Sequence, residues 1–213
     1  MQKKAIILDL DNTIYPVTSI GNKLFASLLK LIQESKDHDR FFDEIKKDIM
    51  RRPFQVVAAA FNFSTALTQE GIDLLKELTY DEAMLPFEDY VYTKNLLCKK
   101  YLVTTGFQKL QQSKIAALGI ENDFEEINIV DPLTSTRTKK DVFADIIFRN
   151  NYDISEVLVV GDDMHSEIKA AQELGIDTVL YDKFNLYPDR GSQQSITNFS
   201  ELKHLLTIKL PRG

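Results

Sequence analysis

The stretch Lys4-Ala-Ile-Ile-Leu-Asp-Leu-Asp-Asn-Thr13 decides how the rest of the chain is interpreted. After Lys4 it continues with apolar, mostly branched residues, and it ends on carboxylate, amide and hydroxyl groups. A continuous apolar run without alternating polar residues is typical of a strand that is buried on both faces of a parallel sheet. We therefore predict a strand over residues 4–10. Segments of the same character predict four more strands, at residues 101–105, 127–130, 157–160 and 178–181.

Helical patterns lie between these strands. Residues 107–118 and 164–174 are each followed by a glycine, Gly119 and Gly175, and glycine commonly follows the last turn of a helix. A third pattern covers residues 141–149, with apolar side chains on one face. Strands that alternate with helices of this length form βαβ units with right-handed crossovers. The sequence therefore predicts the α/β fold class, with a Rossmann-like parallel sheet as its core.

Residues 20–78 interrupt the alternation, because they show helix-like periodicity and no convincing strand. Thr68 is well placed to cap a helix that runs to Leu78, since a hydroxyl can accept from the free backbone N–H groups of the first turn. Arg52-Pro53 is expected to separate two other helices, because proline lacks the backbone donor and disfavours helix in the residue before it.

A helical block inserted after the first strand suggests a small cap over the active edge of the sheet. We predict an α/β core domain made of residues 1–15 and 85–213, and an all-helical cap domain of residues 16–84. The phenylalanines of the cap are expected to form mainly its own core, with one or two of them facing the cleft. These are Phe41, Phe42, Phe54, Phe61 and Phe63.

Composition narrows the classes of partner. The 213-residue chain carries 26 Lys and Arg against 32 Asp and Glu, a net charge of −6, which disfavours nucleic acid or an anionic membrane surface as the main partner. Its one cysteine, Cys98, excludes an internal disulfide framework and a Cys-rich zinc site.

No apolar run approaches the roughly 20 residues that a membrane span needs, and the apolar stretch 5–8 is too short for a signal peptide. The expected location is cytoplasmic.

Polar side chains gather where the predicted strands end, which is the edge where open α/β sheets bind ligands. They are Asp9, Asp11, Thr104, Thr105, Asp131, Lys139, Lys140, Asp162, Asp163 and Glu167. Crowded carboxylates repel one another unless a cation neutralises them, and Mg²⁺ takes carboxylates, waters and a phosphate as ligands. Hydroxyl and lysine groups suit phosphoryl oxygens. Asp9 and Asp11 leave the strand on the same side, so that one can attack phosphorus while the other protonates the leaving alkoxide.

These residues also resemble a known set of motifs. Asp9-Leu-Asp-Asn-Thr13 is similar to the first motif, DxDxT, of the haloacid dehalogenase-like superfamily of phosphohydrolases. Thr104, Lys139 and Gly161-Asp162-Asp163 resemble its second, third and fourth motifs, in the same order. The resemblance covers the whole chain, including a helical cap of the C1 type between the first two motifs. Four motifs in the family's order are strong evidence for the resemblance, whereas a single DxD motif would be weak evidence.

The resemblance implies a role for each acidic motif residue. Asp9 would be the nucleophile that becomes an aspartyl phosphate. Asp11 would be the general acid and then the base that activates water, and its backbone carbonyl would bind Mg²⁺. Asp162 would be the third protein ligand of the ion. Because a halide leaving group needs no proton, the carboxylate of Asp11 favours a phosphatase over a dehalogenase.

The remaining motif residues would bind phosphate or water. Thr104, with Thr105 beside it, would bind the phosphoryl group, and Lys139 would neutralise both the phosphate and the nucleophile. Asp163 or Glu167 would hold metal-bound waters. Three departures from the family pattern stand out: Thr105 replaces a common Asn, Glu167 replaces the usual Asp, and the third motif has Lys-Lys where Lys-Pro is usual. The last departure leaves the choice between Lys139 and its neighbour Lys140 open.

We predict a Mg²⁺-dependent phosphatase that hydrolyses a small phosphorylated metabolite, either a nucleotide or a sugar phosphate monoester. Residues 12–16 are similar to the pyrimidine 5′-nucleotidase-like members of the family, although this segment is too short to identify the substrate. The alternatives are a phosphomutase of the same superfamily and a member that binds a phosphorylated ligand without turnover. A phospho-accepting signalling domain is disfavoured, because its acidic pair precedes the phosphorylated aspartate, whereas Asp162-Asp163 comes last here.

Overall fold

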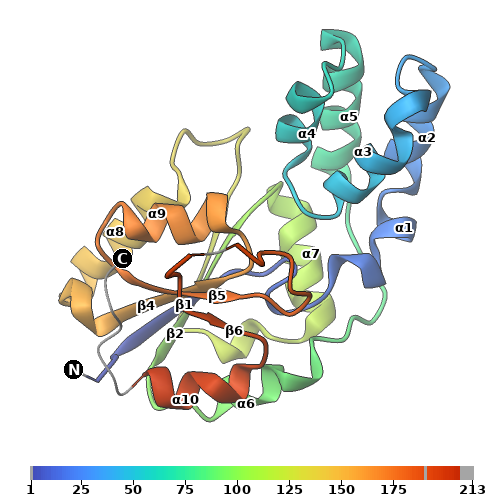
Figure 1. Ribbon diagram of the computed structural model, residues 1–213. Helices are drawn as coiled ribbons and strands as arrows, with labels where there is room; N and C mark the ends of the chain where they lie inside the picture. Colours follow the sequence, from blue (N-terminus) through green and yellow to red (C-terminus); the bar gives the residue numbers. More distant parts are fainter. Residues whose placement is uncertain (1, 190, 207–213) are drawn as a thin grey trace.

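The structure, a computed structural model, describes residues 2–189 and 191–206 (Figure 1). Its six-stranded sheet is parallel throughout and has the order β3-β2-β1-β4-β5-β6. The strands are β1 (Ala5–Leu8), β2 (Lys99–Thr105), β3 (Glu126–Val130), β4 (Val157–Gly161), β5 (Asp177–Tyr181) and β6 (Ser195–Ile196). The predicted parallel α/β core is confirmed, and β6 is an addition that its two residues did not reveal. Residues 1, 190 and 207–213 of the predicted core range lie outside the described residues.

Helices cover both faces of the sheet (Figure 1). One face carries α6 (Val91–Lys94), α7 (Gln108–Leu118) and α10 (Leu202–Leu205), and the other carries α8 (Lys139–Arg149) and α9 (Lys169–Gln172). Successive residues of β1 point to opposite faces, so that Ile6 and Leu8 join the α7 core while Ala5 and Ile7 join the α8 core. Because β1 pairs with both β2 and β4, its carboxyl end lies at the centre of the sheet edge.

An all-helical insertion separates β1 from β2 and stands beyond the carboxyl ends of the strands (Figure 1). It comprises α1 (Gly21–Leu24), α2 (Ala26–Glu34), α3 (Phe42–Ile49), α4 (Phe54–Ala60) and α5 (Thr65–Glu77). The expected break at Arg52-Pro53 is confirmed, because α3 ends before it and α4 begins after it. The expectation that Thr68 caps a helix is wrong. Ser64 caps α5 instead, its hydroxyl accepting from the Leu67 amide at 3.1 Å, so that Thr68 lies inside the helix.

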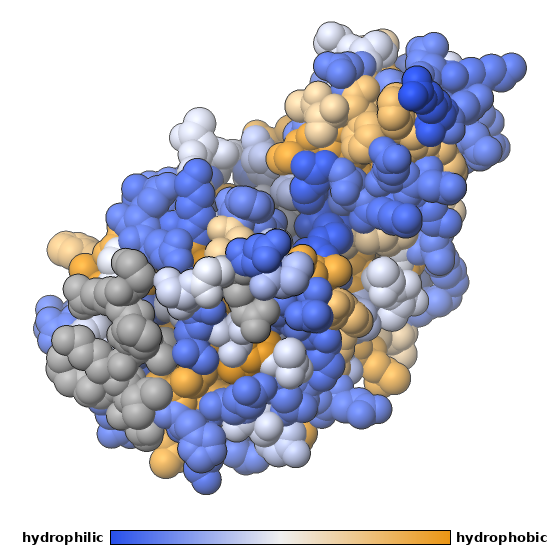
Figure 2. All heavy atoms as spheres, viewed as in Figure 1, coloured by the Kyte–Doolittle hydropathy of each residue, from blue (hydrophilic) through white to orange (hydrophobic). Residues whose placement is uncertain are grey.

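The insertion and the core share one apolar cluster, which runs from the inserted helices down to Ile6 and Leu8 of β1. Phe54 is buried in it, and Phe42, Phe61 and Phe63 pack against it, whereas Phe41 is 41% exposed and departs from the prediction. On the face shown in Figure 2, hydrophilic residues cover most of the surface, and apolar side chains gather over the inserted helices. Within the described ranges, every helix falls short of the length and hydropathy that a membrane span requires.

The connecting helices position the edge residues. As predicted, α7 ends before Gly119, whose φ of 64° lies in the left-handed region that glycine adopts freely. The helix α8 begins at Lys139, two residues earlier than predicted, because Thr138 and Asp141 form a capping box there. The predicted helix 164–174 is instead a π-helical turn, η6 (Met164–Ile168), followed by the short α9.

Short 3₁₀ turns complete the connections. They are η1 (Val17–Ser19), η2 (Asp39–Phe41), η3 (Glu88–Tyr90), η4 (Glu121–Asp123), η5 (Ile154–Glu156) and η7 (Phe199–Glu201).

Candidate active site

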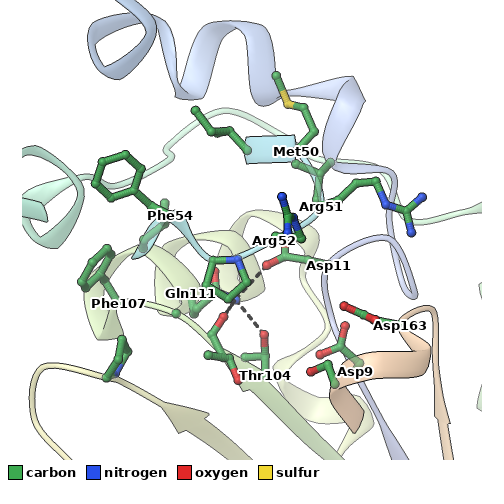
Figure 3. A pocket seen from close by; sticks show the side chains of 18 of the residues that line it. Asp9, Asp11, Met50, Arg51, Arg52, Phe54, Thr104, Phe107, Gln111 and Asp163 are labelled. Atoms are coloured by element: carbon green, nitrogen blue, oxygen red, sulfur yellow. Dashed lines mark hydrogen bonds between the residues drawn. The ribbon is translucent and has the colours of Figure 1, made fainter. Parts of the chain in front are cut away.

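A cavity of about 130 Å³ lies between the carboxyl edge of the sheet and the inserted helices. Its floor consists of residues that follow β1, β2 and β4, with α7 on one side, and the segment between α3 and α4 forms its roof (Figure 3). Asp9, Asp11, Thr104, Thr105, Lys139, Asp162, Asp163 and Glu167 all line it. The structure therefore brings the residues that the sequence singled out into one cavity, although they come from four separate segments of the chain.

Asp9 and Lys139 form a buried pair in the floor. The Lys139 Nζ donates to Asp9 Oδ1 at 2.7 Å and to Glu167 Oε2 at 2.8 Å. Burial raises the pKa of Asp9 to about 7, against the opposing charge of Lys139. Burial alone would lower the pKa of Lys139, but the two carboxylates raise it above its usual value, so that the ammonium group keeps its charge. Lys140 faces away and pairs with Glu173 on the surface at 2.9 Å.

Asp9, Asp162 and Glu167 form a cluster that could hold a metal ion, since one carboxylate oxygen from each lies within 4.8 Å of the others. Burial raises the pKa of Asp162 well above its usual value, and the charges of Glu167 and Asp9 raise it further. For Glu167, burial acts in the same direction, but the charge and hydrogen bond of Lys139 lower its pKa overall. Crowded, buried carboxylates with only partial neutralisation fit a hard divalent cation with oxygen ligands.

Glu167 reaches the cluster because of the local backbone. It lies in the π-helical turn η6, where Ser166 has non-helical dihedral angles (φ −108°, ψ −106°). Its Oε1 accepts from the Asp163 amide at 2.7 Å. A side chain at Gly161 would collide with the Glu167 carboxylate, so that glycine at the end of β4 leaves room for Glu167 in this position. The Asp163 side chain caps this turn, and its Oδ1 accepts from the His165 amide at 2.8 Å.

The Asp11 side chain turns towards α7. Its carboxylate accepts from Lys114, Gln111 and the Tyr15 hydroxyl, with Lys114 Nζ at 2.9 Å from Oδ1 and 3.1 Å from Oδ2. Burial would raise the pKa of Asp11, but the charge of Lys114 and these hydrogen bonds lower it overall. Sequence reasoning missed Gln111 and Lys114. The signal for them is weak, because two polar residues three apart on a helix ordinarily lie on its solvated face.

Thr104 and Thr105 end β2 at the cavity. The Thr104 hydroxyl is buried and accepts from Gln111 Nε2 at 2.7 Å (Figure 3). Thr105 is half-buried, and its carbonyl accepts weakly from the same amide at 3.4 Å. Asp131 takes a structural position, since its carboxylate accepts from the Gln108 and Leu133 amides at 2.9 Å each.

The roof adds cations that the motif residues did not predict. Arg51 and Arg52 extend from the segment between α3 and α4 above the acidic floor (Figure 3). Arg51 Nη2 lies 3.7 Å from Asp162 Oδ2. Arg52 pairs with Asp48, and its buried Nε has no hydrogen-bond partner within the described residues. Buried donors without partners are rare, so that this N–H group is an unsatisfied donor in the roof segment.

Comparisons with known proteins agree with this geometry. A family model described as haloacid dehalogenase-like hydrolase matches residues 3–175. The chain is 24% identical over 204 residues to the glyceraldehyde 3-phosphate phosphatase of Methanopyrus kandleri. The alignment covers 83% of this chain and 82% of the relative. It is 26% identical over 217 residues to the ribulose-1,5-bisphosphate 5-phosphatase of Halopiger xanaduensis, with 84% of each chain covered.

A solved structure shares the fold. The magnesium-bound HAD-hydrolase YfnB from Bacillus subtilis superposes with a TM-score of 0.61 at 20% identity, over 98% of this chain and 100% of that one.

Proposed function

Because the chain belongs to the haloacid dehalogenase-like hydrolases, we propose that it is a Mg²⁺-dependent phosphatase that hydrolyses a small phosphate monoester through an aspartyl phosphate on Asp9. The observation that carries the proposal is the contact between Asp9 and Lys139 in the floor of the cavity, beside Asp162 and Glu167. A nucleophilic carboxylate needs a nearby cation, since it must approach a phosphoryl group that is itself negatively charged.

In the first step, an Asp9 oxygen attacks phosphorus and the bond to the leaving alkoxide breaks. The Lys139 Nζ lies 2.7 Å from Asp9 Oδ1, where it holds the nucleophile and balances its negative charge. The electron pair of the broken bond goes to the alkoxide, which takes a proton from Asp11. In the second step, Asp11 takes a proton from water as the water oxygen attacks phosphorus, and the Asp9 carboxylate is released. One carboxyl group therefore serves both as acid and as base.

We further propose how the phosphoryl group and the ion are held. Thr104 and Thr105 would bind phosphoryl oxygens beside Lys139. The side chains of Asp9 and Asp162 and the backbone carbonyl of Asp11 would hold Mg²⁺, with Asp163 or Glu167 binding its waters. The carboxylate cluster supports this assignment, because its charge is only partly balanced by Lys139. Bound there, the ion would neutralise charge on the transferring phosphoryl group.

The inserted helices would act as a cap, for which we propose the bounds 16–84. A cap over the cavity excludes bulk water and supplies specificity. Its Arg51 and Arg52 face the acidic floor and favour an anionic ligand. The two relatives are named for glyceraldehyde 3-phosphate and ribulose 1,5-bisphosphate. We therefore propose a small sugar phosphate, or a metabolite of that size, as the substrate.

The test is phosphate release from a panel of monoesters that includes D-glyceraldehyde 3-phosphate, ribulose 1,5-bisphosphate and nucleoside monophosphates. We expect release from at least one compound with Mg²⁺ and none with EDTA. Asp9→Asn should lower kcat by about 1,000-fold or more, since the nucleophile is lost. Lys139→Gln should cause a comparable loss, whereas Lys140→Gln, the matched control on the surface, should retain wild-type activity.

Two outcomes would count against the proposal. If the wild-type protein released no phosphate from any ester, it would not be a phosphatase of this class. If Asp9→Asn kept full activity, another group would be the nucleophile. Transfer of the phosphoryl group within or between sugar phosphates, without release of inorganic phosphate, would identify a phosphomutase instead.

A further inference from the structure

The helix α7 carries two buried polar side chains that the phosphoryl chemistry above does not use. Gln111 is 1% exposed and Lys114 is 3% exposed, and they lie three residues apart, on one face of the helix. Burying an amide or an ammonium group is unfavourable unless hydrogen bonds replace the lost water. The partners of these two groups therefore show what the structure uses them for.

Both side chains contact the same carboxylate. Lys114 Nζ donates to both oxygens of Asp11, at 2.9 and 3.1 Å, and Gln111 Nε2 donates to Oδ2 at 3.0 Å. The Tyr15 hydroxyl donates to Oδ1 from the loop that follows β1. Donors on two separate elements thus fix the position and the rotation of the Asp11 carboxyl group.

The same amide connects Asp11 to Thr104. Gln111 Nε2 has two hydrogens, and its close acceptors are Asp11 Oδ2 at 3.0 Å and Thr104 Oγ1 at 2.7 Å (Figure 3). Because the Thr104 hydroxyl accepts from Gln111, its own hydrogen is free to donate into the cavity. A donor is what a phosphoryl oxygen needs at that position. The amide therefore orients two groups at once.

We infer that Gln111 and Lys114 are positioning residues, which hold the Asp11 carboxyl group where it can give a proton to the leaving oxygen and later take one from water. This inference rests on the proposed phosphatase function and extends it. Lys114 acts through Asp11, and Gln111 acts through Asp11 and Thr104. Proton transfer requires the donor and acceptor within hydrogen-bond reach, so that a carboxyl group free to rotate would be a poorer acid and base.

The inference predicts a dependence on the leaving group. An alkoxide needs a proton as it departs, whereas p-nitrophenolate is stable without one. The ratio kcat/KM covers the steps up to the departure of the leaving group. A displaced Asp11 should therefore slow phosphoryl transfer from an alkyl ester and leave transfer from a nitrophenyl ester nearly unchanged. Hydrolysis of the aspartyl phosphate needs the base for both esters, so that kcat should fall for both.

The experiment compares D-glyceraldehyde 3-phosphate with p-nitrophenyl phosphate for Lys114→Met in the full-length protein with Mg²⁺. We expect kcat/KM to fall by about 100-fold for the alkyl ester and by less than about 5-fold for the aryl ester, within the range of general acid catalysis. The aryl ester should give a burst of p-nitrophenolate as the aspartyl phosphate accumulates. Lys109→Met, the same change at an exposed lysine of α7, should leave both esters unaffected.

A double mutant tests whether Lys114 acts through Asp11. In the Asp11→Asn background, Lys114→Met should cost less than about 3-fold, because the group that Lys114 holds is already disabled. If Lys114→Met fails to fold, Tyr15→Phe removes a single oxygen from the same carboxyl contacts and should show the same selectivity for the alkyl ester.

Equal losses on the two esters, or additive losses in the double mutant, would overturn the inference while leaving the phosphatase function intact. A wild-type protein that releases phosphate from no ester of the panel would overturn both.

Discussion

Asp162 illustrates how the site places charge at the scale of single residues. Its carboxylate is buried beside those of Asp9 and Glu167, and Lys139 contacts the other two carboxylates rather than this one. Burial and the two neighbouring charges raise the pKa of Asp162 well above its usual value. The folded protein without a cation therefore holds a proton at this position that the unfolded chain releases near its ordinary pKa of 3.8.

This arrangement predicts a pH-dependent effect of Asp162→Asn on stability in EDTA. A group whose pKa is raised by folding favours the folded state at low pH, and this contribution is lost as the pH rises through the folded-state pKa. At pH 3.5, below the ordinary pKa of 3.8, the variant should match the wild type. At pH 8, where the unfolded chain has released this proton and the folded wild type pays for the buried carboxyl group, the variant should be more stable by about 1–2 kcal/mol. Thermal unfolding at the two pH values measures this difference.

Mg²⁺ provides the control. A ligand that binds only the folded state stabilises it, so that saturating Mg²⁺ should raise the Tm of the wild type and have a smaller effect on Asp162→Asn. An Asp162→Asn protein that is less stable than the wild type at pH 8 in EDTA would show that the buried carboxylate does not destabilise the folded state.

The sequence predicts residues at strand ends better than residues on helices. Asp9 and Asp162 directly follow apolar strands and Thr104 lies at the end of one, so that topology alone brings them to one edge. The choice between Lys139 and Lys140 depends on the phase of α8, which the Thr138 capping box sets. Likewise, Gln111 and Lys114 lie in the site only because α7 packs with that face towards Asp11, which is a tertiary contact and not a periodicity.

At the scale of elements, the core strands were predictable because parallel strands buried on both faces have a distinctive apolar sequence. The inserted helices were predictable as helices but not in their bounds. Thr68 and Ser64 are both acceptable capping residues, and the packing of α5 selects Ser64. The departure of Ser166 from helical geometry, which allows Glu167 to reach the cluster, has no signature in the sequence.

The packing of α4 against α5 leads to a prediction for Gly71→Ala. Alanine favours a helix by about 1 kcal/mol over glycine. Here, however, the new methyl group would collide with the buried ring of Phe54 and lie 3.2 Å from Leu28 Cδ1. Overpacking costs about 1–3 kcal/mol, so that the free energy of unfolding should fall by about 1 kcal/mol overall. Urea denaturation measures the change.

Two further variants separate the effect of helix propensity from the effect of the collision with Phe54. Glu70→Ala, at the exposed neighbouring position, should change stability by less than about 0.5 kcal/mol. Phe54→Leu combined with Gly71→Ala should cost less than the sum of the single changes, because the smaller side chain relieves the collision. A Gly71→Ala protein that is more stable than the wild type would mean that helix propensity outweighs the collision.

At the scale of the whole molecule, few polar contacts join the inserted helices to the core near the site. Asn12 makes one of them, since its Nδ2 donates to the Met50 carbonyl at 3.0 Å while its Oδ1 accepts from the Val17 amide at 3.1 Å. Met50 directly precedes Arg51 and Arg52 in the roof of the cavity. One side chain next to Asp11 therefore links the roof segment to the loop that follows β1.

Loss of this contact should weaken substrate binding more than folding. We expect Asn12→Gly to raise KM by about 5–10-fold, because the segment that carries the arginines is no longer held over the cavity, while losing about 1 kcal/mol of stability for the hydrogen bonds removed. Glycine retains the backbone conformation, since Asn12 has a φ of 57°. Asn62→Gly is the matched control, because Asn62 is exposed and has a φ of 55° in the turn between α4 and α5. Steady-state kinetics on the substrate found by phosphate release tests both variants. If Asn12→Gly and Asn62→Gly had the same KM, the segment between α3 and α4 would be held over the cavity by apolar packing between the inserted helices and α7 instead.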